Sequence, residues 1–399
     1  MSLNNTPSAE RLHIGIFGKR NAGKSSIINA ITGQELAIVS EVKGTTTDPV
    51  YKAMELLPLG PVVMIDTPGL DDEGELGAMR VRKSYQVLNK TDIALVVADA
   101  ADGVGAAETA LIERIRKKGI PYLIVYNKSD VGAQPVMSEN SISVSAKTGE
   151  NIHALKERIG RLVPQGDSGK RIVGDLLSPS DIAVLVVPVD SAAPKGRLIL
   201  PQQQTIRDIL DASAIAAVTK ETELSETLAA LGKPPRMVIT DSQAFGLVSK
   251  LVPEKIPLTS FSILFSRYKG NLAAAVRGAK AVDSLEDGDS VLICEGCTHH
   301  RQCEDIGTVK MPAWIKKHTG KDLAFHFTSG TEFPDDLSPY RLIIHCGGCT
   351  LNEREMQYRI KCAADSGIPM TNYGTMIAYI HGILARSVAL FPDVAAILK

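Results

Sequence analysis

The stretch LHIGIFGKRNAGKSS, residues 12–26, decides the fold of the first part of the chain. It opens with an apolar, β-rich run typical of a buried strand and continues into the pattern G-x-x-x-x-G-K-[ST] at the start of a helical segment. In this pattern the glycine-rich loop and the helix N-terminus wrap phosphate groups with backbone N–H groups. The lysine contacts the β and γ phosphates, and the first serine holds Mg²⁺. The phosphate-binding residues that we predict are Gly18, Gly23, Lys24, Ser25 and Ser26.

Strand-like and helix-like patterns alternate on both sides of this loop. The run PVVMID is strand-like, for example, and residues 106–118 have a helical pattern. This alternation predicts an α/β fold, in which a P-loop domain with a mainly parallel sheet is followed by two smaller α/β domains. A segment rich in glycine, serine and charge, PQGDSGKR, marks the first boundary. The expected domains are residues 1–170, 171–265 and 266–399.

Two further motifs identify the base of the nucleotide as guanine. NKSD, residues 127–130, follows the strand-like run PYLIVY, and the Asp130 carboxylate can accept both donors on the guanine edge. Asn127 would tie the loop in place, and the Lys128 stem would cover the ring. SAK can place a backbone N–H on the guanine oxygen, and its residues are Ser145, Ala146 and Lys147.

The two remaining motifs would sense the γ-phosphate. In DTPG, Asp66 is expected to reach Mg²⁺ through water, and Gly69 to face the γ-phosphate. In GTTTD, Thr46 is the predicted switch threonine and a second Mg²⁺ ligand. The five motifs in this order resemble the GTPases of the TrmE/Era group over about residues 10–165, and this resemblance implies GTP hydrolysis to GDP and phosphate.

One departure from other GTPases bears on the rate. Leu70 follows DTPG where Ras-like proteins have a glutamine that orients the attacking water, so we expect slow intrinsic hydrolysis. Asn21 matches the asparagine that in TrmE-like GTPases helps bind K⁺, which implies K⁺-stimulated hydrolysis. The alternative is that Asn21 only braces the loop. The residues expected to act in catalysis are Asn21, Lys24, Thr46 and Gly69.

All six cysteines lie after residue 290, in CEGCTHHRQCEDIG, IHCGGC and one later helical run. The polar N-terminus lacks the charged start and apolar run of a secretory signal, and no long apolar run marks a membrane span. A cytoplasmic protein with no membrane partner is therefore expected, and a disulfide is disfavoured there. A Cys₄ zinc site built from two C-x-x-C pairs and an iron–sulfur cluster both remain open.

Both cysteine runs follow an apolar strand, in SVLICEGC and RLIIHCGGC. If the two strands are parallel neighbours, both loops leave the sheet at the same edge, where α/β proteins usually build their sites. An iron–sulfur site would then use Cys297, Cys346 and Cys349, with a weaker fourth ligand. The candidates for that fourth ligand are His299, His345 and Glu304, and the alternative for either histidine is to hydrogen-bond to a cluster sulfur or shape the pocket.

The GTPase motifs, the motif-poor middle segment and the pattern C-x-H…H-C-x-x-C together resemble the HydF family of [FeFe]-hydrogenase maturation GTPases along essentially the whole chain. The resemblance implies that the three cysteines bind a 4Fe-4S cluster and that the middle domain forms a homodimer. It also implies a scaffold that receives a transient di-iron precursor from two radical-SAM maturases and delivers it to the apo-[FeFe]-hydrogenase.

The balance of charge weighs against a rival function. The chain has 44 Lys plus Arg and 45 Asp plus Glu, so no whole-chain attraction draws it to nucleic acid. An RNA-modification or ribosome-assembly GTPase with a structural zinc site is the main alternative, and a redox sensor is a third. We expect no nucleic-acid partner.

Overall fold

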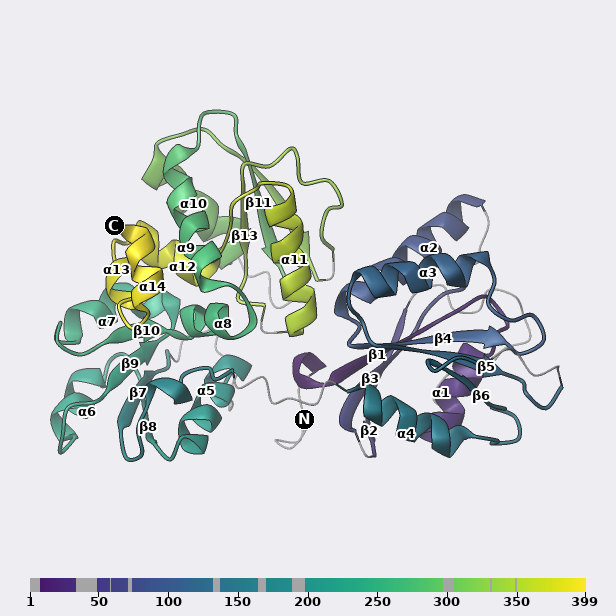
Figure 1. Cartoon of the computed structure of the whole chain (residues 1–399). Helices are drawn as coiled ribbons and strands as arrows, with labels where there is room; N and C mark the ends of the chain where they lie inside the picture. The colour runs from purple at the N-terminus through teal and green to yellow at the C-terminus, as the bar shows by residue number, and fades with distance from the viewer. Residues whose placement is uncertain are drawn as a thin grey trace. The chain divides into compact units, whose positions relative to one another are not determined.

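A computed structural model of the chain describes residues 8–33, 49–57, 59–70, 74–131, 137–163, 170–188, 198–296, 305–330, 332–348 and 350–399. The chain divides into two compact units, one ending at Gly166 and the other beginning at Asp167 (Figure 1). Both units are α/β with mainly parallel sheets, so the predicted fold class is confirmed. None of the described helices is both long enough and apolar enough to cross a bilayer.

The first unit contains one six-stranded sheet. Its strands are β1 Leu12–Phe17, β2 Val50–Leu56, β3 Gly60–Asp66, β4 Ile93–Asp99, β5 Tyr122–Asn127 and β6 Ser141–Ser143. Its helices are α1 Lys24–Thr32, α2 Gly74–Val87, α3 Ala106–Lys117 and α4 Ile152–Leu162. The strand order is β2-β3-β1-β4-β5-β6, and only β2 runs antiparallel to its neighbour.

Both faces of this sheet are buried because helices cover each of them (Figure 1). Ile14 and Ile16 pack on one face with the apolar side chains of α1 and α4. Phe17, Val63 and Ile65 pack on the other face with those of α3. Strands buried on both faces are rich in branched apolar residues, which explains the near-continuous apolar runs of the sequence.

The second unit contains two four-stranded parallel sheets. The strands of the first are β7 Ile182–Val186, β8 Ile215–Thr219, β9 Met237–Thr240 and β10 Leu258–Ser260, in the order β10-β9-β7-β8. The strands of the second are β11 Ser290–Glu295, β12 Ala324–Ser329, β13 Leu342–His345 and β14 Met370–Asn372, in the order β12-β11-β13-β14. The helices are α5 Leu200–Asp211, α6 Leu224–Ala230, α7 Phe245–Leu251, α8 Phe261–Lys269, α9 Leu272–Lys280, α10 Met311–Thr319, α11 Glu353–Asp365, α12 Tyr373–Ile380, α13 Leu384–Ser387 and α14 Pro392–Ala395.

The C-terminal segment joins these two sheets. Leu384, Val388 and Phe391 are buried in the same apolar core as β7, β9 and α8. The Arg386 guanidinium donates to the carbonyl oxygens of Ser249 at 2.9 Å and Val252 at 2.8 Å. The core of the sheet β7–β10 is therefore completed by residues that follow the sheet β11–β14 in the chain.

His13 is an ionisable group inside the core of the first unit. Its residue is 6% exposed, and its Nδ1 atom lies 2.8 Å from the Arg11 carbonyl oxygen. Burial lowers the pKa of His13 to about 4 from its ordinary 6.5, against the raising effect of the Arg11 contact and with a smaller lowering effect of Lys90. The His13 side chain therefore binds a proton below about pH 6.5 in the unfolded chain, but only below about pH 4 in the folded chain.

Acidification should accordingly destabilise the protein through His13. Between pH 7 and pH 5 the free energy of unfolding should fall by about 2 kcal/mol from this group. His13→Gln should remove that part of the fall, measured by thermal unfolding of the full chain followed by circular dichroism. His153→Gln, at a side chain that is 88% exposed, is the control and should keep it. The same pH dependence in both variants would contradict the expectation.

Candidate functional site

Two glycines fix the loop between β1 and α1. Gly18 has φ of +149°, and a Cβ atom there would lie 2.1 Å from the Val97 carbonyl oxygen. Gly23 has φ of +90°, and a Cβ atom there would lie 2.1 Å from Nδ2 of Asn127. No side chain fits at either position, so the loop backbone can approach β4 and the loop after β5 closely. The loop leads into the N-terminus of α1, where free N–H groups favour anions.

Lys24 and Asn21 differ in how the loop holds them. Lys24 is 8% exposed, and its Nζ donates to the carbonyl oxygens of Gly18 at 3.0 Å and Lys19 at 2.7 Å. Asn21 is exposed and has φ of +59°. Its side chain makes no hydrogen bond to any residue that the structure describes. Asn21 thus lies at the surface of the loop in the left-handed region.

Ser25 and Asp66 form a polar pair at the end of β3. The Ser25 hydroxyl donates to Oδ2 of Asp66 at 2.7 Å, while the buried Oδ1 atom of Asp66 has no hydrogen-bond partner among the residues that the structure describes. Burial raises the pKa of Asp66, although the Ser25 hydrogen bond and the Lys24 charge oppose this. A buried carboxylate oxygen without a partner beside a hydroxyl fits a magnesium site, because hard oxygen ligands are those that Mg²⁺ prefers.

The DTPG segment is tied to its surroundings at three points. The Thr67 hydroxyl donates to the Ile16 carbonyl at 2.6 Å, and the Ser84 hydroxyl of α2 donates to the Pro68 carbonyl at 3.1 Å. The Leu70 N–H donates to the Gly18 carbonyl at 3.3 Å, which places buried Gly69 next to the phosphate loop. Thr46, the predicted switch threonine, lies outside the described residues.

The base-binding motifs meet at the ends of β5 and β6. Asn127 donates through Nδ2 to the Ala22 carbonyl at 3.0 Å and accepts through Oδ1 from the Ala146 N–H at 3.1 Å. The Ser145 hydroxyl donates to Oδ1 of Asp130 at 2.7 Å. Asn127 thus joins the phosphate loop to the SAK loop, and Ser145 orients the carboxylate predicted to read guanine. Lys147 of the SAK loop is exposed.

Two carboxylates that no sequence motif indicates contact the nucleotide loops. The Lys128 ammonium donates to Oδ2 of Asp99 at 2.7 Å. Glu108, which is 1% exposed, accepts from the Gly105 N–H at 3.1 Å and lies 3.5 Å from the Lys19 ammonium. Neither carboxylate belongs to a nucleotide motif, so only the fold could reveal these contacts.

The second site lies at the carboxyl ends of β11 and β13. These strands are parallel neighbours, with Cys294 opposite His345, so the condition under which both loops leave the sheet at one edge is met. The Cys346 N–H donates to the Cys294 carbonyl at 2.8 Å, and the Gly296 N–H donates to Sγ of Cys346 at 3.0 Å. Gly296 directly precedes Cys297 in the chain, so the last described residue before that cysteine contacts Cys346. Four predicted ligands lie outside the described residues, and they are Cys297, His299, Glu304 and Cys349.

His345 does not fit the predicted role of an iron ligand. Its side chain is fully buried, and its Nδ1 atom lies 2.8 Å from the Cys346 carbonyl oxygen. Its Nε2 atom lies 3.0 Å from Nη1 of Arg359. The Nε atom of the same Arg359 side chain donates to Oε1 of Glu355 at 2.9 Å. Burial and, as the next cause, the Arg359 charge lower the pKa of His345 to about 3, against the raising effect of the Cys346 contact. Both ring nitrogens of this neutral imidazole are occupied, so neither has a lone pair left for iron.

Cys294 does not belong to the predicted three-cysteine cluster site, and it lies in the core. The residue is fully buried on the face of β11 that packs with Leu292, Phe333 and Ile343. Burial raises the pKa of the Cys294 thiol to about 11, so the thiol stays protonated at neutral pH. Cys294 therefore lies among apolar side chains, the position expected of a thiol outside the cluster pattern.

A carboxylate that sequence analysis did not single out lies at the same strand ends. Oε1 of Glu295 accepts from the Tyr373 hydroxyl at 3.2 Å. Burial raises the pKa of Tyr373, with the Glu295 carboxylate as the next cause, so Tyr373 remains a donor. Gly307 leaves room for this pair, because a Cβ atom there would lie 2.2 Å from the Tyr373 hydroxyl oxygen.

Comparison with known families divides the chain into three matched regions. Residues 13–128 match the model of the 50S ribosome-binding GTPase family. Residues 172–270 match the hydrogen maturase F dimerization domain, and residues 273–390 match the hydrogen maturase F tetramerization domain. The last two regions together cover more than half of the chain.

Similar proteins match the first region. The tRNA modification GTPase MnmE of Thiobacillus denitrificans is 36% identical over 152 residues, which are 38% of this chain and 33% of that protein. MnmE of Xanthomonas oryzae pv. oryzae is 38% identical over 168 residues, 41% of this chain and 36% of that protein. The chain thus spans only about a third of the length of these relatives. Aquifex aeolicus Era bound to GDP and AlF₄⁻ is 19% identical, with a TM-score of 0.35 over 55% of this chain and 98% of that one.

The fold and the nucleotide site define a P-loop GTPase, which binds GTP or GDP with Mg²⁺ and hydrolyses GTP. The two matched regions that follow the GTPase domain in the chain show the family. The chain belongs to the hydrogen maturase F family, whose domains indicate a GTPase of hydrogenase maturation and support an oligomer.

The carboxylate of Asp66 should matter for magnesium. Asp66→Asn replaces an anionic oxygen by a neutral amide beside Ser25, and we expect the Mg²⁺ affinity to fall by about tenfold or more. The measurement is a Mg²⁺ titration of GTP hydrolysis by the full chain. Asp102→Asn, at an exposed carboxylate, should leave the titration unchanged. A curve for Asp66→Asn that overlays the wild-type curve would show that Asp66 does not contribute to Mg²⁺ binding.

Proposed function

We propose that this GTPase is a scaffold that binds a 4Fe-4S cluster, assembles the di-iron precursor and transfers it to the apo-[FeFe]-hydrogenase. The observation that carries the proposal is the meeting of the two cysteine-bearing loops. The N–H of Gly296, the residue before Cys297, donates to Sγ of Cys346 at 3.0 Å. Similarity to MnmE supports only the GTPase part, because it covers about two fifths of the chain.

The residues around Cys346 fit an iron–sulfur cluster. Sγ of Cys346 accepts from the N–H groups of Gly296 and, at 3.4 Å, Gly348, and such hydrogen bonds to sulfur tune cluster potentials. A Cβ atom on Gly347 would meet no neighbour within 4 Å in the described part of the chain. When bound, the cluster supplies an iron with which the incoming precursor can share a bridging group. In this proposal its ligands are Cys297, Cys346 and Cys349.

A fourth, weaker ligand would complete the cluster. His345 is engaged on both ring nitrogens, which leaves His299 and Glu304 as the candidates that the sequence named. An oxygen or imidazole ligand suits a scaffold, because it gives way to an incoming group more readily than a thiolate does.

In the nucleotide site, we assign Lys24 to the β and γ phosphates and Ser25 and Thr46 to Mg²⁺. Gly69 senses the γ-phosphate, and Asp130 with the SAK residues Ser145, Ala146 and Lys147 recognises guanine. Hydrolysis is slow because the apolar side chain of Leu70 cannot orient water. GTP turnover acts as a switch that changes the contact with partners, through ordering of the Thr46 loop and the DTPG segment.

The partners follow from the same assignment. Two radical-SAM maturases supply the precursor, and the apo-hydrogenase receives it in the cytoplasm. In this proposal residues 1–170 form the GTPase domain, residues 171–265 form the homodimer, and residues 266–399 carry the cluster. A match to dimerization and tetramerization models supports an oligomer of this kind.

Asn21 should make hydrolysis dependent on K⁺. The wild-type chain should hydrolyse GTP about tenfold faster or more in K⁺ than in Na⁺, because the cation offsets charge that develops in the transition state. Asn21→Gly keeps the left-handed backbone and removes the amide, so the preference for K⁺ should vanish. Asn151→Gly, at another asparagine with φ of +57°, is the control and should retain it. Equal wild-type rates in the two salts would refute this role.

Cys346 should be needed for the cluster. After anaerobic reconstitution with iron and sulfide, the wild-type chain should contain a 4Fe-4S cluster by metal analysis and EPR, and Cys346→Ser should lose most of it. Cys362→Ser, on α11, should keep the cluster, and so should Cys294→Ser. Tightly held zinc with equal dependence on Cys294 and Cys346 would instead indicate a Cys₄ site and refute the proposal.

A further inference from the structure

Helix α11 contains a buried ion pair that neither the nucleotide site nor the proposed ligands of the cluster include. Arg359 is fully buried, and its Nε atom donates to Oε1 of Glu355, one turn earlier on the helix, at 2.9 Å. The guanidinium also donates to the Gly330 carbonyl at 3.1 Å, and its Cζ atom lies 5.2 Å from the centroid of the Phe333 ring. Because burying two charges costs free energy, apolar residues of similar volume often fill such a place without loss of stability. The pair therefore indicates a role besides packing.

Arg359 determines which nitrogen of His345 carries the proton. A guanidinium has only donors, so its Nη1 atom, 3.0 Å from Nε2 of His345, donates to that nitrogen. Nε2 is then the acceptor, and the proton of the neutral imidazole lies on Nδ1. Nδ1 is 2.8 Å from the Cys346 carbonyl oxygen, to which it donates. The three groups form a relay that runs from the guanidinium through the imidazole to the backbone of the cysteine-bearing loop.

The relay sets the direction of the peptide group that joins Cys346 to Gly347. Because a trans peptide group is planar, its N–H points to the side opposite its carbonyl oxygen. The Cys346 carbonyl points at the buried imidazole, so the Gly347 N–H points away from it. Gly347 is exposed, and its N–H makes no hydrogen bond to the residues that the structure describes. The relay therefore holds this donor in a direction that leads out of the core.

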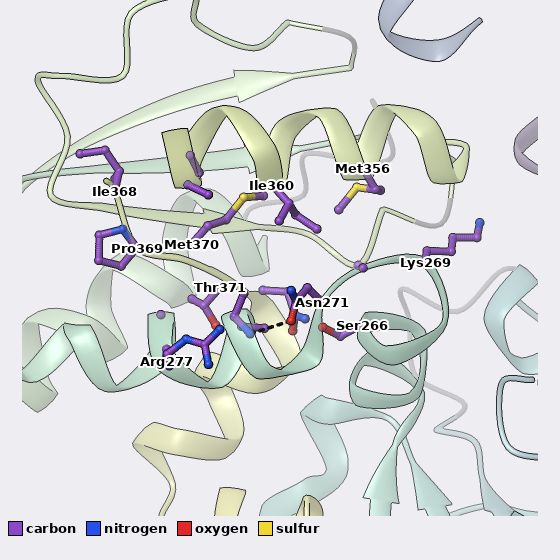
Figure 2. Close-up of a pocket in the computed structure, with 18 of the residues that line it drawn as sticks. Ser266, Lys269, Asn271, Arg277, Met356, Ile360, Ile368, Pro369, Met370 and Thr371 are labelled. Carbon is purple, nitrogen blue, oxygen red and sulfur yellow. Dashed lines mark hydrogen bonds between the residues drawn. The ribbon is translucent and has the colours of Figure 1, made fainter. Parts of the chain in front are cut away.

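Helix α11 also shapes the loop at the next residue. Gly348 has φ of +62°, and a Cβ atom there would lie 2.6 Å from Sδ of Met356, so a side chain does not fit. Figure 2 shows Met356 and Ile360 on the side of α11 that points toward α9. Gly347 has a negative φ, and successive residues of opposite φ turn their N–H groups to one side, as at many iron–sulfur sites. The Gly348 N–H contacts Sγ of Cys346 at 3.4 Å, so the Gly347 N–H faces the side of that sulfur.

We propose that Arg359 and His345 are positioning residues of the cluster site, which hold the Gly347 N–H toward a sulfur of the cluster. The inference rests on the cluster proposed above and gives a role to side chains that do not bind iron. Hydrogen bonds to cluster sulfur stabilise the more negative, reduced state, so they raise the reduction potential. Glu355 balances the charge of Arg359 inside the core. The relay thus adjusts the potential through one backbone donor.

The first test examines the imidazole in the full wild-type chain without a cluster. After ¹⁵N labelling of histidine, the nitrogen chemical shifts at pH 7 distinguish the two neutral tautomers, and the signals that disappear in His345→Asn are those of His345. We expect His345 to be entirely the Nδ1–H tautomer, because its Nε2 accepts from Arg359. An Nε2–H tautomer, or a mixture of the two, would overturn the relay.

The second test measures the reduction potential of the reconstituted cluster by anaerobic redox titration followed by EPR. His345→Gln places an acceptor near Arg359 but no donor at the Cys346 carbonyl, so the potential should fall. His345→Asn places an amide donor where Nδ1 lies, and it should keep a potential close to that of the wild type. His326→Gln, at an exposed histidine of β12, is the control and should change nothing. Equal shifts in the two His345 variants would mean a merely structural histidine and would overturn the proposal.

Arg359 is tested together with Glu355, so that no charge is left buried alone. The double substitution Glu355→Gln and Arg359→Met should lower the potential in the wild-type background, because it releases the imidazole. It should have no effect in the His345→Asn background, because an amide donates to the carbonyl without help from Arg359. A fall of the same size in both backgrounds, or a fall in neither, would refute the relay. Thermal unfolding of each variant verifies that it is folded.

The outcomes separate this inference from the scaffold proposal. If reconstitution yields no cluster, the scaffold proposal fails and the positioning role fails with it, while the tautomer still shows whether the relay exists. If the cluster forms but the potentials do not follow the expected order, only this inference is overturned. Imidazole nitrogen couplings in the EPR of the wild-type cluster that disappear in His345→Asn would show that His345 binds iron, which would also overturn it.

Discussion

The hydrogen bond from the Cys346 N–H to the Cys294 carbonyl, 2.8 Å long, is the contact on which the second site depends. It extends the parallel pairing of β11 with β13 by one residue and sets the register at which the two strands end. Parallel strands deliver their loops to one edge, so a fixed register brings Gly296 and Cys346 together although 49 positions separate them. A slip of one residue would turn Cys346 to the opposite face and separate the two loops.

The nucleotide site could be predicted from the sequence because its geometry is local. Gly18 and Gly23 adopt backbone angles that other residues rarely adopt, so the residue type reports the shape of the loop. The residue type at Asn127 is equally informative. Its short amide lies at the end of β5 and hydrogen-bonds to two loops, those of Ala22 and Ala146. Motifs of this kind tie residue type, spacing and chemistry to one another.

The roles of side chains that depend on partners far away in the sequence could not be predicted from such motifs. His345 has the chemistry of a metal ligand, yet Arg359 on α11 and the Cys346 carbonyl use both of its nitrogens. Glu108 supports the phosphate loop from α3, and Glu295 pairs with Tyr373 across the strand ends. Each contact joins residues that no sequence period relates, so it follows only from the way the helices pack on the sheets.

The shared core of the second unit has a consequence for the order of synthesis. Leu384, Val388 and Phe391 close the apolar core of the sheet that contains β7 and β9, and Arg386 caps the carbonyls between α7 and β10. Domains generally fold from the N-terminus as the chain leaves the ribosome. The core of this sheet, however, is complete only after the residues that follow β11 to β14 have been synthesised. The nascent chain therefore cannot complete the region that matches a dimerization domain before its cysteine-bearing strands exist. Subunits that pair in the cell would each already possess the strands that carry the proposed cluster site.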